Sequence, residues 1–316
     1  MRNILSSFNL IPKALSIFYI KKQKFKVVLS GNPLVTGLCA LLIAKLTGAK
    51  TIIEVQGNFK KAFNYGAQGT VEPKLMGKIK LFLADNIVPF VLKKADAVKL
   101  EYSTQLNSYG IMREANINSY FFPNMVDIDS FLNEVKQNRK YILLVCFPWY
   151  LKGVDILINA FNKVYKDYPN YKLKIVGWCP EGRDYFERLS KDNPNIELCK
   201  PVPHKEIITI MNACSLYVLA SRTDASPRVL REAMASKKPI IASNVDGVPE
   251  LIKDGFNGLL FESENINDLA EKISLLLSDN KYAQQLATNG YRHVQEKFSE
   301  KIYINNYKHI IDNLLQ

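Results

Sequence analysis

Residues 216–235 read LYVLASRTDASPRVLREAMA and join an apolar stretch to a helical one. The stretch Leu216–Leu219 is apolar throughout, which is typical of a buried strand. Ser226 and Pro227 then mark a helix start, because serine is a favoured N-cap and proline suits the first helical position. A strand that leads through a short loop into a helix predicts part of a β–α–β unit.

The same alternation of strands and helices runs through most of the chain. Strands are predicted at 26–29, 50–55, 97–100, 141–146, 173–176, 196–199, 216–219, 239–242 and 259–261. Helices are predicted at 38–46, 75–94, 103–109, 154–168, 184–191, 207–213, 229–235, 266–277 and 302–315, whereas 57–73 is polar and without a clear period. This order predicts an α/β fold of two doubly wound, Rossmann-like domains. We expect a first domain at 1–135, a second at 136–298, and a C-terminal helix at 299–316 that packs back on the first domain.

The helix that follows Pro227 begins with a predicted anion site. The first backbone N–H groups of a helix have no partner within it, and the helix dipole favours negative charge there. Asp224 precedes this start, and Glu232 leans back toward it from within the helix. Carboxylates accept hydrogen bonds from hydroxyls, so acids beside a phosphate site suit a sugar or a ribose. The alternative interpretation is a capped surface helix with incidental acids.

A lysine adds to this site. Lys152 follows the first strand of the same predicted domain, from which its side chain can reach a diphosphate in the cleft. A solvated surface lysine is the alternative interpretation.

The charge of the chain is uneven. Its 42 Lys and Arg against 30 Asp and Glu give a net charge of +12, and the first acid is Glu54. A basic opening with apolar residues at helical spacing can lie on an anionic membrane surface, although a solvated helix end is equally compatible with it. We expect no nucleic-acid partner, since stacking aromatics and reader motifs are missing. Without a signal peptide or a membrane-spanning stretch, and with five scattered cysteines, the chain is predicted to be cytoplasmic. If the basic opening lies on lipid, the chain is peripheral at the inner face of the membrane.

These motifs make the chain resemble the retaining glycosyltransferases of family 4, which have the GT-B fold. The hallmark is Asp224 and Glu232, separated by seven residues and followed by the sequence Ala-Met-Ala. Further matches are KGVD at 152–155, IVG at 175–177, GVPE at 247–250, ADA at 95–97 and PNMVD at 123–127.

The resemblance implies transfer of a sugar from a UDP- or GDP-sugar to a glycan or lipid-linked acceptor, with retention and without metal or cofactor. Glu232 would bind the ribose, Asp224 the donor sugar and Lys152 the diphosphate. Other donor-side contacts are expected from Ser226, Arg228, Val229, Leu230, Gly177 and Arg222, and acceptor-side contacts from Gln56 and Gly57.

Several positions depart from the family pattern. Phe147 replaces an arginine that usually contacts the diphosphate, Gln56 replaces a histidine, and Lys237 replaces a glycine. At Lys237 a positive φ would cost up to about 1 kcal/mol.

The first domain is expected to lack its N-terminal part. One alternative function is therefore a non-catalytic nucleotide-sugar-binding subunit that needs a partner chain. A nucleotide-sugar epimerase ranks last, because the histidines at 204, 293 and 309 lie outside the motifs.

Overall fold

The computed structural model describes residues 9–20, 22, 24–67, 74–111, 117–132, 140–179 and 182–316. The chain forms two compact units, Met1–Pro123 with Tyr303–Gln316, and Asn124–Ile302. The predicted domain boundary at 135/136 falls among residues 133–139, outside the described part. The predicted donor-side residues all belong to the second unit, whereas Gln56 and Gly57 belong to the first.

The first unit is built on four parallel strands in the order β1-β2-β3-β4. The three predicted strands are present, and the prediction lacked the fourth, which is three residues long. The strands are β1 (Val27–Ser30), β2 (Lys50–Val55), β3 (Ala97–Leu100) and β4 (Ser119–Phe121). The helices are α2 (Leu10–Leu15), the π-helical η1 (Ser16–Ile20), α3 (Val35–Thr47), α4 (Phe59–Ala67), α5 (Lys74–Lys94), the 3-10 helix η2 (Gln105–Tyr109) and α13 (Glu300–Leu315).

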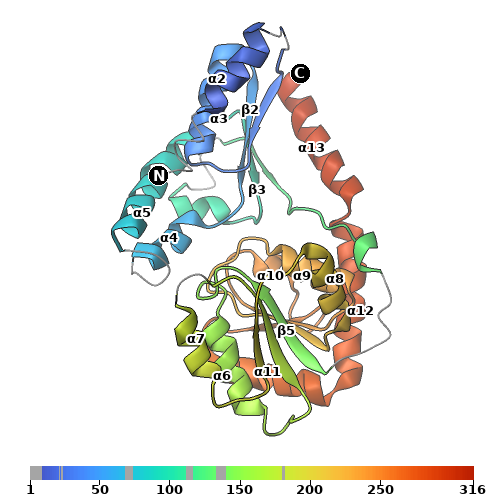
Figure 1. Cartoon of the computed structure of the whole chain (residues 1–316). Helices are drawn as coiled ribbons and strands as arrows, with labels where there is room; N and C mark the ends of the chain where they lie inside the picture. Colours follow the sequence, from blue (N-terminus) through green and yellow to red (C-terminus); the bar gives the residue numbers. More distant parts are fainter. Residues whose placement is uncertain are drawn as a thin grey trace. The chain divides into compact units, whose positions relative to one another are not determined.

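Helices cover both faces of this sheet (Figure 1). Val98 and Leu100 pack on one face among residues of α3 and α5. Ile52 and Ala97 pack on the other face with Ile310 of α13, which is fully buried. The C-terminal helix therefore completes the core of the first unit, although it follows the second unit in sequence.

Helix α4 was not predicted, because the stretch 57–73 has no extended apolar period. Its ring pair, Phe59 and Phe63, lies one turn apart with centroids 6.0 Å from each other. Both rings pack against the core of the first unit. Tertiary packing therefore stabilises a helix that local pattern does not specify.

The second unit holds six parallel strands in the order β10-β9-β8-β5-β6-β7. All six were predicted to within one residue at each end. The strands are β5 (Tyr141–Cys146), β6 (Lys172–Gly177), β7 (Ile196–Cys199), β8 (Leu216–Leu219), β9 (Ile240–Ser243) and β10 (Leu259–Phe261). The helices are the 3-10 helix η3 (Asp129–Phe131), α6 (Val154–Val164), α7 (Arg183–Ser190), α8 (His204–Ala213), α9 (Arg228–Ala235), α10 (Val248–Leu251), α11 (Ile266–Ser278) and α12 (Asn280–Lys297). Of these helices, η3, α10 and α12 were not predicted.

Each face of this second sheet is buried under helices. Ile142 and Leu144 of β5 pack with α6, α7 and α11, while Leu143 packs with α8 and α9 on the opposite face. Burial on both faces explains why β5, β8, β9 and β10 are apolar runs without polar alternation, whereas β6 and β7 also carry Lys172, Lys174 and Glu197. None of the helices in the described ranges is long and apolar enough to span a bilayer.

Candidate functional site

The strand order of the second sheet reverses between β5 and β8. From β5 the sheet continues through β6 and β7, whereas β9 and β10 lie on the far side of β8. Ligands of open parallel sheets bind beyond the carboxyl ends of the strands at such a reversal. Lys152 follows β5 and Asp224 follows β8, so the switch point lies between the two predicted residues.

A glycine brings the two loops together. Gly153 has a φ of 65°, and a Cβ built on it would lie 1.9 Å from the carbonyl oxygen of Ala220. The backbone N–H of Arg222 donates to the carbonyl of Leu151 over 2.8 Å. The glycine of the Lys-Gly pair is therefore a packing requirement, because only glycine allows this approach of the β5 loop to the end of β8.

Lys152 and Asp224 meet in an ion pair. Their side chains are 22% and 11% exposed, so the pair is partly withdrawn from water but open to a ligand. Ser221 Oγ donates to Asp224 Oδ2 over 3.3 Å, and the Asp224 backbone N–H donates to Asp246 Oδ2 over 3.0 Å. Thr223 Oγ1 donates to the same oxygen over 2.5 Å. Asp246, which sequence reasoning missed, therefore fixes the loop that carries Asp224.

The start of α9 differs from its prediction in one respect. Pro227 occupies the cap position without a side-chain cap, and Ser226 Oγ instead accepts a 2.6 Å hydrogen bond from Arg231 Nη1. The Leu230 N–H donates to the Pro227 carbonyl over 3.1 Å. Among the described residues, the N–H groups of Arg228 and Val229 have no partner. The predicted anion site therefore retains two of its three free amides, and the prediction of Ser226 as the cap was wrong because Arg231 engages its hydroxyl.

Glu232 is held at one oxygen. Its side chain is 3% exposed, and Oε1 lies 2.8 Å from Arg228 Nε and 3.0 Å from His204 Nε2. Oε2 has no hydrogen-bond partner in the described part of the chain. One oxygen thus anchors the carboxylate to Arg228 and His204. Sequence reasoning missed His204, which precedes Glu232 by 28 residues and stands in no motif.

Arg222 points into the protein. Its guanidinium donates to both oxygens of Asp155 over 2.8 and 2.6 Å, to Glu264 over 2.8 Å and to the Tyr150 carbonyl over 2.6 Å. It also stacks on the Tyr150 ring at 4.1 Å. Burial alone would lower the pKa of this guanidinium, but the bonds and charge of Asp155 raise that pKa above its usual value. The structure thus gives Arg222 a scaffold role, with Asp155 of the KGVD motif as its partner.

The remaining predicted residues lie at the edges of this arrangement. Gly177 ends β6, and a Cβ there would lie 1.9 Å from the Cys146 carbonyl oxygen, so close strand packing requires it. Phe147, in place of the expected arginine, is 57% exposed. Lys237 has the positive φ expected of it, 51°, and its ammonium lies 4.4 Å from the Tyr291 ring centre.

In the first unit, Gln56 and Gly57 follow β2. The Gln56 side chain donates to Glu54 Oε2 over 2.7 Å, and the Gly57 carbonyl accepts from the Tyr109 hydroxyl over 3.0 Å. Both residues thus lie at the carboxyl end of a parallel strand, the edge where sheets of this kind bind ligands.

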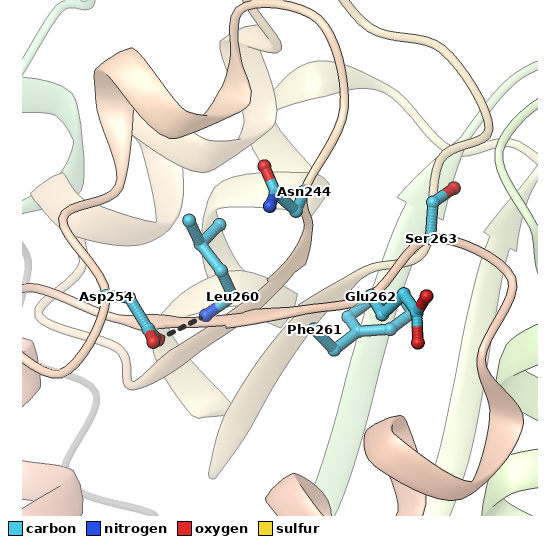
Figure 2. A pocket seen from close by; sticks show the side chains of 6 residues that line it. All are labelled: Asn244, Asp254, Leu260, Phe261, Glu262 and Ser263. Atoms are coloured by element: carbon cyan, nitrogen blue, oxygen red, sulfur yellow. Dashed lines mark hydrogen bonds between the residues drawn. The ribbon is translucent and has the colours of Figure 1, made fainter.

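A second hollow, of about 510 Å³, lies at the end of β9 and β10. Figure 2 shows its lining, with Asp254 accepting a 2.7 Å hydrogen bond from the Leu260 N–H. It contains none of the predicted site residues. No cluster of three or more His, Cys, Asp or Glu side chains suited to a metal ion occurs in the described ranges.

The sequence of this chain is similar to those of known glycosyltransferases. Residues 127–293, more than half of the chain, match the family described as glycosyl transferases group 1. An uncharacterised glycosyltransferase of Methanocaldococcus jannaschii is 37% identical over 152 residues, which are 47% of this chain and 41% of that protein. The capsular polysaccharide biosynthesis glycosyltransferase CapM of Staphylococcus aureus is 24% identical over 95% of this chain and 79% of its own length.

A third relative is a Campylobacter jejuni enzyme named N,N'-diacetylbacillosaminyl-diphospho-undecaprenol alpha-1,3-N-acetylgalactosaminyltransferase. It is 32% identical over 66% of this chain and 56% of its own length. The chain therefore spans between 41% and 79% of the length of these three relatives.

Solved structures share the fold. Sucrose-phosphate synthase of Thermosynechococcus elongatus superposes with a TM-score of 0.80 at 19% identity, over 98% of this chain and 79% of that one. The Anabaena protein HepE in complex with UDP-glucose superposes with a TM-score of 0.74 at 16% identity, over 95% of this chain and 81% of that one. These likenesses confirm the predicted GT-B fold.

Proposed function

Because the chain belongs to the glycosyl transferases group 1 family, we propose that it transfers a sugar from a nucleotide-sugar to a glycan or lipid-linked acceptor. The observation that carries this proposal is the ion pair of Lys152 and Asp224 at the switch point of the second sheet, in the loop that leads to the free amides at the start of α9. Cation, amides and acids there match the parts of a nucleotide-sugar: a diphosphate between two polyhydroxyl groups.

The donor is a UDP- or GDP-sugar in this proposal. HepE binds UDP-glucose on the same fold, which supports a nucleotide-sugar here. Oε2 of Glu232 accepts hydrogen bonds from the ribose hydroxyls, while His204 and Arg228 hold Oε1. The N–H groups of Arg228 and Val229 bind a phosphate at the positive end of α9.

Lys152 and Asp224 act at the bond that breaks. The Lys152 ammonium stabilises the negative charge that develops on the leaving diphosphate, which is electrostatic catalysis by a preorganised cation. Asp224 holds Lys152 in place and contacts the donor sugar. The leaving phosphate guides the acceptor hydroxyl to the same face of the sugar, so configuration is retained, as in family 4, without metal or cofactor.

The acceptor side rests on the first unit, with Gln56 and Gly57 as the proposed contacts. CapM is named for capsular polysaccharide biosynthesis, and the name of the Campylobacter relative includes a diphospho-undecaprenol, a lipid carrier. These names support a role in bacterial polysaccharide or glycolipid assembly. A lipid-linked acceptor would place the chain at the inner face of the cell membrane, where its basic opening suits anionic lipid.

The test is calorimetric titration with UDP and GDP, followed by an assay for nucleotide-sugar hydrolysis without acceptor. Glu232→Ala is expected to abolish hydrolysis and to weaken nucleotide binding, whereas Glu271→Ala, an exposed acid on α11, leaves both unchanged. Circular dichroism confirms that both variants fold. Full hydrolysis by Glu232→Ala would refute the assignment.

The alternative is a nucleotide-sugar-binding subunit that acts with a partner chain. Exposed Phe147 at the place of a diphosphate-binding arginine favours it, because one positive charge is missing from the site. This alternative predicts binding without turnover and co-purification with a second protein. If the chain is such a subunit, Phe147→Arg is expected to restore slow hydrolysis of the nucleotide-sugar. An epimerase, by contrast, would convert the sugar of the nucleotide-sugar and release no free nucleotide.

A further inference from the structure

Helix α5 carries an apolar stripe on its outer face. Leu75, Ile79, Phe82 and Phe90 are 72%, 46%, 66% and 51% exposed. Their spacing of four, three and eight residues places all four on one side of a helix with 3.6 residues per turn. The helix already buries Val88 and Val91 in the core on its other side. The exposed stripe is therefore a second apolar face, which the fold of the unit does not require.

The stripe is continuous along the helix. Single exposed apolar residues are ordinary, but a contiguous row of large ones marks an interaction surface. The one polar position within the row, Asn86, turns its side-chain amide back to the Phe82 carbonyl over 2.7 Å. Because this hydrogen bond occupies the Asn86 amide on the helix itself, Asn86 interrupts the apolar stripe only slightly.

The charge around the stripe is positive. Helices α4 and α5 together contain seven lysines and one acid, Asp85. Asp85 is paired with Lys60 of α4 at 3.0 Å, so the one acid within these two helices is neutralised by a lysine. Lys74 and Lys78 lie beside the N-terminal half of the stripe, and Lys93 and Lys94 lie at its end.

We propose that the α5 stripe inserts into the interface of an anionic lipid bilayer, with the flanking lysines on the lipid headgroups. Apolar side chains bordered by lysines on a helix that lies along a surface are the pattern of interfacial membrane binding. A second copy of the chain fits less well, because two such faces would bring lysines against lysines. The proposal goes beyond glycosyl transfer and does not depend on it, since lipid binding needs neither donor nor acceptor.

Sedimentation with vesicles tests this surface directly. The full chain is expected to bind vesicles that contain phosphatidylglycerol at least tenfold more tightly than pure phosphatidylcholine vesicles, and 0.5 M NaCl is expected to weaken this binding. The double variant Ile79→Ser/Phe82→Ser is expected to lose at least tenfold in affinity. Its matched control is Leu275→Ser/Ile304→Ser, which changes two apolar residues elsewhere that are 44% and 54% exposed and is expected to bind as wild type.

Charge variants and a fluorescent reporter give independent readouts. Lys74→Glu/Lys78→Glu is expected to weaken binding, whereas Lys191→Glu/Lys301→Glu, which makes the same charge change at exposed sites elsewhere, weakens it less. Phe82→Trp is expected to be quenched by brominated lipid, and Phe256→Trp is not. Equal vesicle binding by the stripe variant and its control would overturn the proposal and place membrane contact elsewhere. A wild-type dimer that the stripe variant abolishes would also overturn it, in favour of a second copy.

Discussion

Replacing Arg222 by methionine distinguishes a scaffold role from a donor contact. The sequence predicts that this arginine binds the donor, whereas the structure turns it toward Asp155, Glu264 and the Tyr150 carbonyl. Arg222→Met keeps an apolar side chain of similar length but removes the charge. We expect the variant to lose folding stability, because Asp155 is then left as a buried carboxylate without its cation.

The magnitude follows from the burial of the pair. The Arg222 side chain is 6% exposed and that of Asp155 is 11% exposed, so neither charge can be solvated when its partner is removed. Breaking a buried ion pair on one side costs about 3–5 kcal/mol. For a unit of this size that corresponds to a fall in Tm of about 6–20 °C. Removing both charges in Arg222→Met/Asp155→Leu is expected to recover much of the loss, because no unpaired charge remains.

Thermal and urea unfolding, followed by circular dichroism, measure this effect, and titration with UDP measures donor binding in the same variants. Glu264→Gln is the control, since its side chain is 53% exposed and its loss is expected to cost at most about 1 kcal/mol. The scaffold role is refuted if Arg222→Met melts with the wild type but no longer binds the nucleotide. That result would return Arg222 to the donor site, as the sequence predicts.

Three further predictions follow from single contacts. Gly153→Ala is expected to destabilise the second unit by several kcal/mol in urea unfolding, because the new Cβ would lie 1.9 Å from the Ala220 carbonyl oxygen. Wild-type stability of this variant would contradict the close approach of Gly153 to Ala220. Burial alone would raise the pKa of Asp96, but hydrogen bonds from Thr51 and Lys50 outweigh burial and lower that pKa. Ionised Asp96 therefore stabilises the first unit above pH about 4, and this stabilisation is lost as pH falls through the lower, folded pKa. Asp96→Asn should therefore cost about 1–2 kcal/mol at pH 7, and its unfolding curve should approach that of wild type in acid; a constant gap at all pH values would contradict this sign. His204→Ala is expected to weaken nucleotide binding by about three- to tenfold, about 1 kcal/mol, because Glu232 loses one of the groups that hold its carboxylate in place. His204→Asn is expected to recover part of this loss. Unchanged nucleotide titrations would show that His204 does not position Glu232.

The elements of the second unit could be read from the sequence because their signals are local. Most of its strands are short apolar runs and each predicted helix has an apolar face of regular period, and neither signal depends on which strands become neighbours. Helix α4 was missed for the opposite reason: its two aromatic rings gain stability only from packing against the core. The fourth strand of the first unit was missed because three residues carry too little pattern.

The sequence by itself determined the α/β order, and it predicted the acids Asp224 and Glu232 and the lysine that pairs with Asp224, since these stand at fixed places after apolar runs. The tertiary structure alone decided the partners of each charge. Arg222 meets Asp155 across 67 positions because β8 lies beside β5 and the loops beyond them share one edge. Glu232 meets His204 across 28 positions because α8 and α9 pack on the same face of the sheet. A side chain's role depends on the charges within a few ångströms of it, and that neighbourhood is set by strand order, which no local pattern encodes.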